Sequence, residues 1–152
     1  MDFDEFEAQL ASVRAQRVRD DMPEELNPFD AITASEAQLA ETETTLNVRL
    51  PDQYKEFLRR IGGGAFLFLD VLPAEAKEAV FEDLVSVNRG PMRILDFIAV
   101  APVGTGDWWG FPVAGGVCDE RVFFWDHETG DLQLESRDFL EFLAKHGLSV
   151  NR

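Results

Sequence analysis

Hydrophobic residues in the first part of the chain recur at three- and four-residue steps, which is the spacing of an amphipathic helix. The positions are Phe3, Phe6, Leu10 and Val13. Acids stand at the start of this segment and arginines towards its end, as the helix dipole favours. The next segment, 20–30, holds two prolines and many acids, so we interpret it as a linker.

Two more helices are expected before residue 65. Thr33 and Glu36 have the spacing of a capping box, which predicts a helix that opens at Thr33. Another helix is predicted to begin near Pro51, because proline is tolerated in the first turn. Gly62–Gly64 should end it, since glycine readily adopts the left-handed conformation that follows helix C-termini. Its apolar face comprises Tyr54, Phe57, Leu58 and Ile61.

After the glycines the pattern changes to short runs rich in β-branched and aromatic residues, which favour strands. The segment 65–72 predicts one strand, and the segment 73–90 predicts a helix. Further strands are predicted from ILDFIAVAPV, DWWGFPV, RVFFWDH and LQLES. A final helix, capped by Ser136, is expected to end before Gly147. Its buried face comprises Phe139, Phe142 and Leu143.

The order of elements is helices, then a run of strands, then one helix. This order predicts an α+β fold with a mostly antiparallel sheet flanked by helices. We place the domain at residues 31–152 and interpret residues 1–30 as an N-terminal amphipathic helix with an acidic linker. The pattern leaves open whether that helix packs on the domain or exchanges with a second copy.

Charge is the one extreme property of the composition. The chain has 14 lysines and arginines against 29 acids, for a formal net charge of −15. Direct binding to nucleic acid is disfavoured, because it requires cations that displace counterions from phosphates. A basic protein partner is favoured, since opposite charges speed encounter. Solubility alone accounts for the charge equally well.

The expected location is the cytoplasm. No apolar run is long enough to span a bilayer, and the acidic start of the chain is unlike a secretory signal. The lone Cys118 cannot form an internal disulfide and has no zinc-ligand spacing around it. Asp119 and Glu120 should raise the pKa of its thiol by repelling the thiolate, so we expect an inert cysteine. No cofactor is expected.

The segment GTGDWWGF has the glycines of a phosphate-binding loop but not its setting. Such loops open a helix, whereas here the glycines precede Asp107 and a strand. We therefore predict a turn in which Asp107 accepts hydrogen bonds from nearby amides. Strand alternation should direct Trp109, Phe111 and Val113 to one face of the sheet and Trp108 to the other.

The segment WDHETGD offers oxygen and nitrogen ligands, but not at the spacing of a calcium loop, because Gly130 is fifth from Asp126 and Arg137 is twelfth. Neighbouring residues on a strand also point to opposite faces, so Asp126 and His127 are not expected to share an ion. We predict a hairpin turn and no metal site.

His146, in the last turn of the final helix, is explained by the helix dipole. Trp108, Phe123 and Trp125 could form an exposed aromatic platform or be half-buried sheet surface.

Four motifs in this order resemble the SUKH superfamily, the Smi/Knr-type domain: RLPDQYKEFLRRIGGG, IAVAPVGTGDWWGF, RVFFWDHETGD and SRDFLEFL. The matching positions include Leu50, Pro51, Tyr54, Gly104, Gly106, Asp107, Trp125, Asp126 and His127. The resemblance implies a SUKH-like α+β fold and a non-enzymatic protein, because the family has no shared catalytic residues. Bacterial members look like cytoplasmic immunity proteins of toxin–antitoxin type, and fungal members like regulators of cell-wall synthesis.

Three functions follow as hypotheses. The first is an immunity protein that neutralises a cognate toxin with a basic surface, such as a nuclease, through its acidic exterior. Its candidate contacts are Trp108, Asp119, Glu120, Glu128 and Asp131. The second is a regulatory or scaffold module with a cellular partner. The third is a hydrolase in which Asp107, Asp126 and His127 converge on one cleft.

Overall fold

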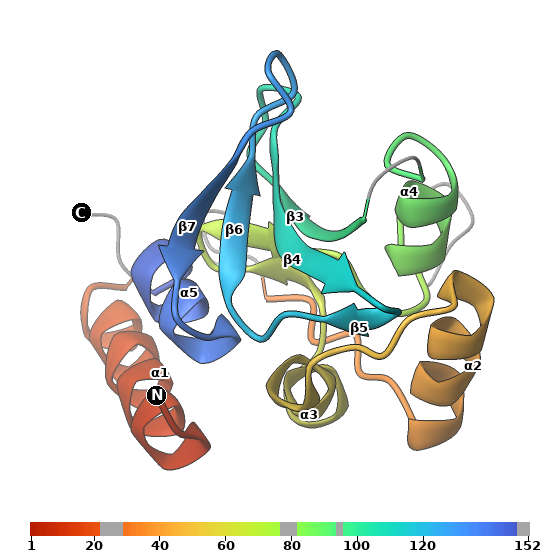
Figure 1. The fold of residues 1–152 in the computed structure, drawn as a ribbon. Helices are drawn as coiled ribbons and strands as arrows, with labels where there is room; N and C mark the ends of the chain where they lie inside the picture. Colours follow the sequence, from red (N-terminus) through yellow and green to blue (C-terminus); the bar gives the residue numbers. More distant parts are fainter. Residues whose placement is uncertain (22–28, 77–81, 94–95, 149–152) are drawn as a thin grey trace.

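In the computed structural model, which describes residues 1–21, 29–76, 82–93 and 96–148, five helices flank a five-stranded antiparallel sheet and a separate β-hairpin (Figure 1). The helices are α1 (Phe3–Arg19), α2 (Glu36–Leu46), α3 (Asp52–Arg60), α4 (Leu84–Arg89) and α5 (Phe139–His146). The strands of the large sheet are β3 (Phe97–Pro102), β4 (Trp108–Ala114), β5 (Val117–Cys118), β6 (Val122–Trp125) and β7 (Leu132–Ser136). The predicted α+β class is confirmed.

The large sheet has the strand order β3-β4-β6-β7, with the short β5 beside β4. Every strand pair in the sheet is antiparallel over the part of the chain that the structure describes. Long hairpin loops join β3 to β4 and β6 to β7, and both project from the same end of the sheet (Figure 1). The sheet therefore has two edges, formed by β3 and by β7.

The core lies between the sheet and helices α3 and α5. The ring of Tyr54 on α3 lies 4.8 Å from that of Phe139 on α5 and 5.3 Å from that of Phe111 on β4. All three side chains are fully buried. The Tyr54 hydroxyl donates a hydrogen bond to the carbonyl of Leu72 at 3.3 Å, so its one polar group is satisfied. This aromatic contact fixes the sheet on its helices.

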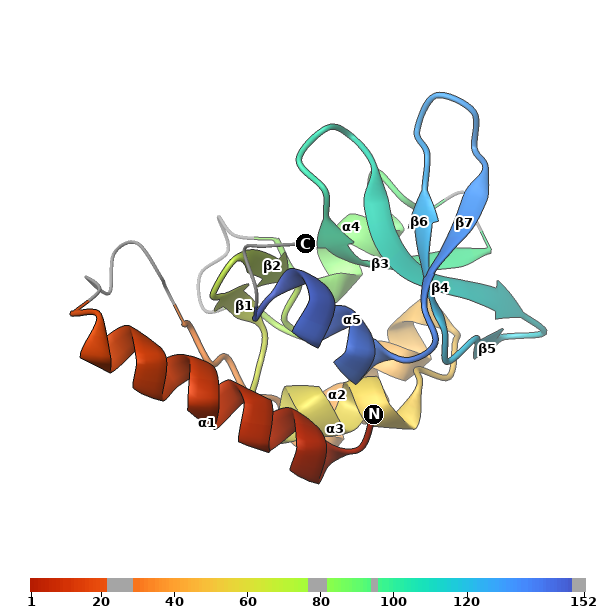
Figure 2. The same ribbon diagram turned by 90° about the vertical axis from the view of Figure 1, so that its left-hand side faces the viewer.

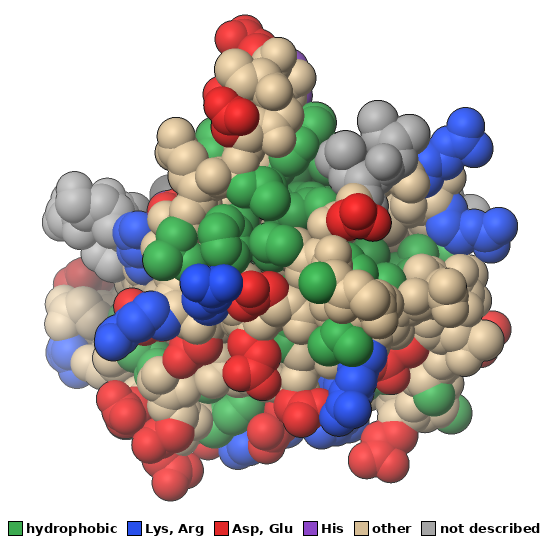
Figure 3. Space-filling model, in the orientation of Figure 1, with side chains coloured by type: hydrophobic (Ala, Val, Ile, Leu, Met, Phe, Trp, Pro, Cys, Tyr) green, Lys and Arg blue, Asp and Glu red, His purple; other side chains and the backbone are tan. Residues whose placement is uncertain are grey.

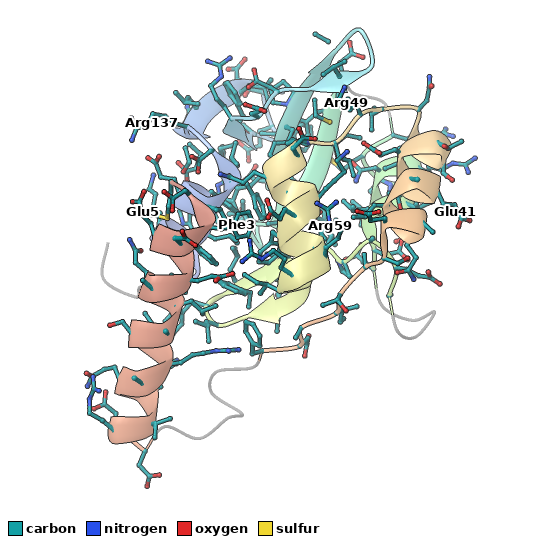
Figure 4. The ribbon with its side chains drawn as sticks, turned by 90° about the horizontal axis from the view of Figure 1, so that it is seen from below. Phe3, Glu5, Glu41, Arg49, Arg59 and Arg137 are labelled. Carbon is teal, nitrogen blue, oxygen red and sulfur yellow. The ribbon has the colours of Figure 1, made fainter. Side chains whose placement is uncertain are left out.

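Helix α1 packs on the rest of the chain beside α3 and α5 (Figures 2 and 4). Phe6 is fully buried, and its ring stacks on that of Phe66 at 6.1 Å. Figure 4 shows Phe3 on the side of α1 that faces α3, where the guanidinium of Arg60 covers its ring. In the single copy that the structure describes, α1 therefore packs on its own domain. The division at residue 30 stays a prediction, because most of the linker lies outside the described residues.

The sequence predicts the starts of two helices within one turn of the starts that the structure shows. Helix α2 is capped by Ser35, not Thr33, and Gln38 in place of Glu36 completes the capping box. Helix α5 is capped by Asp138, whose carboxylate accepts from the Glu141 amide at 2.8 Å. Ser136 cannot cap it, because it is the last residue of β7. Helix α3 does begin after Pro51, as predicted.

The segments 65–72 and 73–90 were predicted correctly only in part. The first is a hairpin of β1 (Gly64–Phe66) and β2 (Leu69–Val71), since Leu67 adopts a left-handed backbone with φ of 54° that turns the chain. In the second, helix α4 begins only after Asp83, which caps it by accepting from the Ser86 amide. Residues 73–76 are not helical, and residues 77–81 of the predicted helix lie outside the described residues.

The β3 edge of the sheet is closed by other parts of the chain. The buried side chain of Asn88 on α4 pairs with both main-chain groups of Ala99, at 2.9 Å to its carbonyl and 2.8 Å from its amide. The Leu72 amide donates to the carbonyl of Val100 at 2.8 Å. A side chain and a neighbouring segment thus take the place of a further strand.

Candidate functional site

The two faces of the large sheet have different surroundings. The ring of Trp109 lies 5.2 Å from Phe142 and 4.6 Å from His146, so its face of the sheet is covered by α5. Trp108 pairs with Trp125, and Trp125 pairs with Leu132, on the opposite face. The predicted placement of Trp108 and Trp109 on opposite faces is consistent with this register.

The face that carries Trp108 presents a cluster of apolar side chains, which we call the open face. Trp108, Phe123 and Trp125 are half-buried. Beside them Leu132 is 42% exposed and Leu134 is 54% exposed. Figure 3 shows hydrophobic side chains gathered over β4, β6 and β7 on this side of the molecule. Contiguous exposed apolar surface commonly marks a site of macromolecular contact. The two aromatic interpretations are therefore compatible, because half-buried rings form the platform.

Acidic turns lie at both ends of β6. Glu128 and Asp131 are exposed in the loop between β6 and β7. At the other end, Glu120 is exposed, while Asp119 is half-buried and accepts hydrogen bonds from the Arg121 side chain at 3.0 and 2.8 Å. These bonds hold the pKa of Asp119 below its ordinary value. The candidate contacts thus form two groups around the open face, and Asp119 is already paired.

The hairpin loops are fastened together by Asp107. Its Oδ1 accepts hydrogen bonds from the main-chain amide of His127 at 2.9 Å and from the ring Nδ1 at 2.7 Å, while its Oδ2 accepts from the Thr105 hydroxyl at 2.6 Å. The Thr105 hydroxyl, followed by the His127 amide and ring, lowers the pKa of Asp107 to about 2. The same carboxylate raises the pKa of His127 above its ordinary value.

The expectation that Asp126 and His127 point apart was wrong. Ligand atoms of Asp107, Asp126 and His127 all lie within 4.8 Å of one another. Strand alternation does not apply here, because β6 ends at Trp125. Hydrogen bonds within the turns account for all three side chains: the Asp126 carboxylate accepts from the Glu128 amide at 2.8 Å, and Asp107 holds His127.

The remaining polar candidates have local partners. Cys118 is buried, and burial, with a smaller contribution from Glu43, raises the pKa of its thiol to about 12. The expected inertness of the thiol agrees with this, although the predicted source, Asp119 and Glu120, was wrong. His146 bonds to Glu135 through Nε2 at 2.6 Å, a specific contact that the helix dipole had not suggested.

Sequence reasoning missed Leu132 and Leu134 as members of the site. The available signal was the alternation in LQLES, which places two leucines on one face of a strand next to an aromatic strand.

Among the residues that the structure describes, no helix is long and apolar enough to cross a membrane.

An α+β fold with a flanking N-terminal helix, a sheet with one open face and two linked hairpin loops define the class of this chain. Residues 36–143 match the model of a SUKH family described as SMI1-KNR4 cell-wall. The chain therefore belongs to the SUKH superfamily. The match contains all the motif positions from Leu50 to His127 and leaves α1 outside it. No curated protein matches the chain.

Proposed function

We propose that this chain is a non-catalytic protein-binding domain that neutralises a cognate toxin by covering it. The observation that carries the proposal is the open face, where Leu132 and Leu134 extend a half-buried aromatic cluster into solvent. A few residues that become fully buried on association, among which tryptophan is enriched, supply most of the affinity of protein interfaces. Trp108 is the central anchor in this proposal.

The charge of the chain supports a basic partner. The formal net charge is −15, and Glu128 and Asp131 stand exposed next to the open face. An acidic rim around an apolar centre suits a toxin whose own site binds phosphate, such as a nuclease, because the acids would occupy the cationic cleft. Glu120 and Asp119 extend this rim at the opposite end of β6, and Asp119 contributes less because Arg121 pairs with it.

The test is co-expression with the toxin encoded by the neighbouring gene. The wild-type chain should restore growth, and Leu132→Asp should reduce the rescue because it places a charge within the contact. Val18→Asp is the matched control, since Val18 is 80% exposed on α1, outside the open face. A toxin that stays lethal beside the folded wild-type chain would contradict the proposal, as would a neighbouring gene product that is harmless when expressed alone.

A second candidate function is a regulatory or scaffold module with a cellular partner. The description of the matching family, which refers to the cell wall, favours it. It differs from the first candidate in one measurable respect. A scaffold module would alter growth or cell-wall assembly when deleted in cells that lack the toxin gene, whereas an immunity protein would be dispensable there.

A hydrolase built on Asp107, Asp126 and His127 predicted that the three side chains converge, and they do. Their hydrogen bonds serve the turns, however, and His127 is exposed at the tip of the hairpins. The discriminating variant is Asp126→Asn, which keeps an oxygen acceptor for the turn amides. Undiminished rescue of growth by this variant would favour the binding function over the hydrolase.

A further inference from the structure

The two edges of the large sheet are treated differently. On β3, the outer main-chain groups of Ala99 are bonded to Asn88 and the carbonyl of Val100 is bonded to Leu72. At the other edge, β7 has α5 behind it, and no strand of the described residues lies beyond it (Figure 1). An edge strand presents a row of unpaired N–H and C=O groups, which is a template for another strand.

The register shows which groups of β7 are unpaired. The Asp126 amide donates to the Asp131 carbonyl at 3.0 Å, so these residues form a bonded pair. In an antiparallel ladder bonded and non-bonded pairs alternate. Phe124–Gln133 is therefore the next bonded pair, and Leu132 and Leu134 direct their N–H and C=O groups away from β6. Within the described ranges, no group is hydrogen-bonded to these outward positions.

The side chains of the same two residues lie on the open face. Leu132 and Leu134 are exposed, next to Trp125 and Phe123 respectively. Natural edge strands are commonly protected from pairing by lysine, proline, bulges or inward-pointing charges. The β7 segment, LQLES, contains no lysine or proline, and its one acid, Glu135, lies at the bulge that follows Leu134 and is directed to the α5 face. Main-chain groups and apolar side chains are thus offered together along one edge, as in proteins that bind peptides by strand addition.

We propose that β7 accepts an extended segment of the protein partner as a further antiparallel strand of the sheet. The proposal names the binding mode and the kind of segment, and it rests on the proposed function for the identity of the partner. The segment would alternate apolar residues, beside Leu132 and Leu134, with residues directed to the other face.

The charge of the hairpin selects a basic segment. Residues 122–136 contain four acids, Asp126, Glu128, Asp131 and Glu135, and the flanking arginines, Arg121 and Arg137, stand at the end of the strands opposite the loop. Glu135 is already bonded to His146 and Trp109, so the complementary charges of the segment would meet Glu128 and Asp131 at the loop end of β7. A second copy of this chain is a poorer occupant, because each copy carries a formal net charge of −15.

The first test uses a short synthetic peptide of alternating valine and lysine as the probe. We expect the amides of Leu132 and Leu134 in the wild-type chain to become protected from hydrogen exchange when the peptide binds. In an antiparallel bonded pair the valines lie opposite the leucines and their amides face β7. N-methylation of the valine amides should abolish binding, and N-methylation of the lysine amides should preserve it. Equal binding of both methylated peptides, or no protection of the two leucine amides at millimolar peptide, would overturn the proposal.

The second test uses two substitutions of one residue. Leu134→Pro removes an outward amide but no bond of the β6–β7 ladder, so it should fold, as circular dichroism would verify. It should weaken peptide binding about tenfold, because about one hydrogen bond to the peptide is lost and the peptide carbonyl is left without a donor. The matched control, Leu134→Thr, keeps the amide and loses the apolar side chain, and should bind more tightly than the proline variant. Equal binding by both variants would refute the added strand.

Growth rescue separates this inference from the proposed function. If the wild-type chain and Leu134→Pro neutralise the toxin equally well, the edge is not used and the neutralising function stands. If the wild-type chain fails to neutralise the toxin but protects its Leu132 and Leu134 amides on binding the peptide, the immunity function is wrong and the strand-accepting edge stands. Concentration-dependent self-association that protects the same two amides in the absence of peptide would identify a second copy as the occupant and overturn the proposal.

Discussion

The carboxylate of Asp107 binds His127 at both its main-chain amide and its ring, at 2.9 and 2.7 Å. Asp107 stands just before β4, and His127 follows shortly after β6. The next pair along these strands is Trp108 and Trp125, two of the three rings of the open face. The contact therefore joins two loops that are distant in sequence and borders the proposed binding surface.

The ring of His127 should lose its raised pKa when Asp107 is replaced by asparagine. The hydrogen bond to the Asp107 carboxylate is the main cause of the raised value, and the ordinary value is 6.5. An NMR titration of the Asp107→Asn variant should show the pKa of His127 falling towards that value. His146, which bonds to Glu135, is an internal control in the same spectrum. An unchanged pKa of His127 would show that Asp107 does not hold the ring.

The same pair makes the stability of the fold depend on pH in two ranges. The pKa of Asp107 is lowered from 3.8 to about 2, so its contribution is present above pH 3.8 and is lost as the pH falls through about 2. The pKa of His127 is raised from 6.5, so its contribution is present below pH 6.5 and is lost as the pH rises through the raised value. The wild type should therefore exceed Asp107→Asn in stability most between pH 3.8 and 6.5, as chemical denaturation across this range would measure.

Local sequence patterns were sufficient to predict the strands of the large sheet, with the exception of the two-residue β5. Alternation in DWWGFPV and RVFFWDH correctly indicated strands, because half-buried antiparallel strands impose a period of two. The N-cap of α2 was ambiguous in the sequence for a physical reason. Thr33 and Ser35 are both good caps, and only the packed chain decides that Ser35 takes the extended backbone before α2. The turn at Leu67 has no local signal, since leucine rarely adopts a positive φ.

The candidate site was predictable only in part. Alternation placed Trp108 on the face opposite Trp109, but no local pattern says which face a helix covers. That choice depends on the contact of α5 with Trp109. The exposure of Leu132 and Leu134 follows from the same contact, together with the position of β7 at the edge of the sheet. The link between Asp107 and His127 spans 20 residues of sequence, so spacing could not reveal it.

Phe6 should contribute strongly to stability although α1 lies outside the segment that matches the family. The side chain is fully buried, and its ring stacks on Phe66. Phe6→Ala should lower the free energy of unfolding by about 3–5 kcal/mol, through lost burial and a cavity. Val18→Ala on the same helix is the control, since Val18 is 80% exposed, and should change stability by about 0.5 kcal/mol or less. Equal effects in urea denaturation would show that α1 is not part of the core.

Gly110 should not tolerate a side chain. A Cβ at this position would lie 2.1 Å from the carbonyl oxygen of Ile98 and 2.8 Å from the ring of Phe97. Gly110→Ala must therefore shift β3 away from β4, at an expected cost of about 2–4 kcal/mol in the free energy of unfolding. Gly115→Asn is a suitable control, because no atom lies within 4 Å of its added Cβ and asparagine tolerates its φ of 60°. A melting temperature of Gly110→Ala close to that of the wild type would contradict the tight pairing of β3 and β4.

The acidic loop between β6 and β7 should control how fast a basic partner associates. Reversal of both exposed acids, in Glu128→Lys with Asp131→Lys, should lower the association rate constant about tenfold at low salt and leave dissociation nearly unchanged, since charges outside a buried contact act mainly by steering. The control is Glu36→Lys with Glu41→Lys, which changes the net charge equally on α2, where Figure 4 shows Glu41 directed away from α3. Because salt screens exposed charges, the two double variants should converge at high ionic strength when stopped-flow mixing measures both rates. A loop variant that associates as fast as the control at low salt would show that the partner approaches another surface.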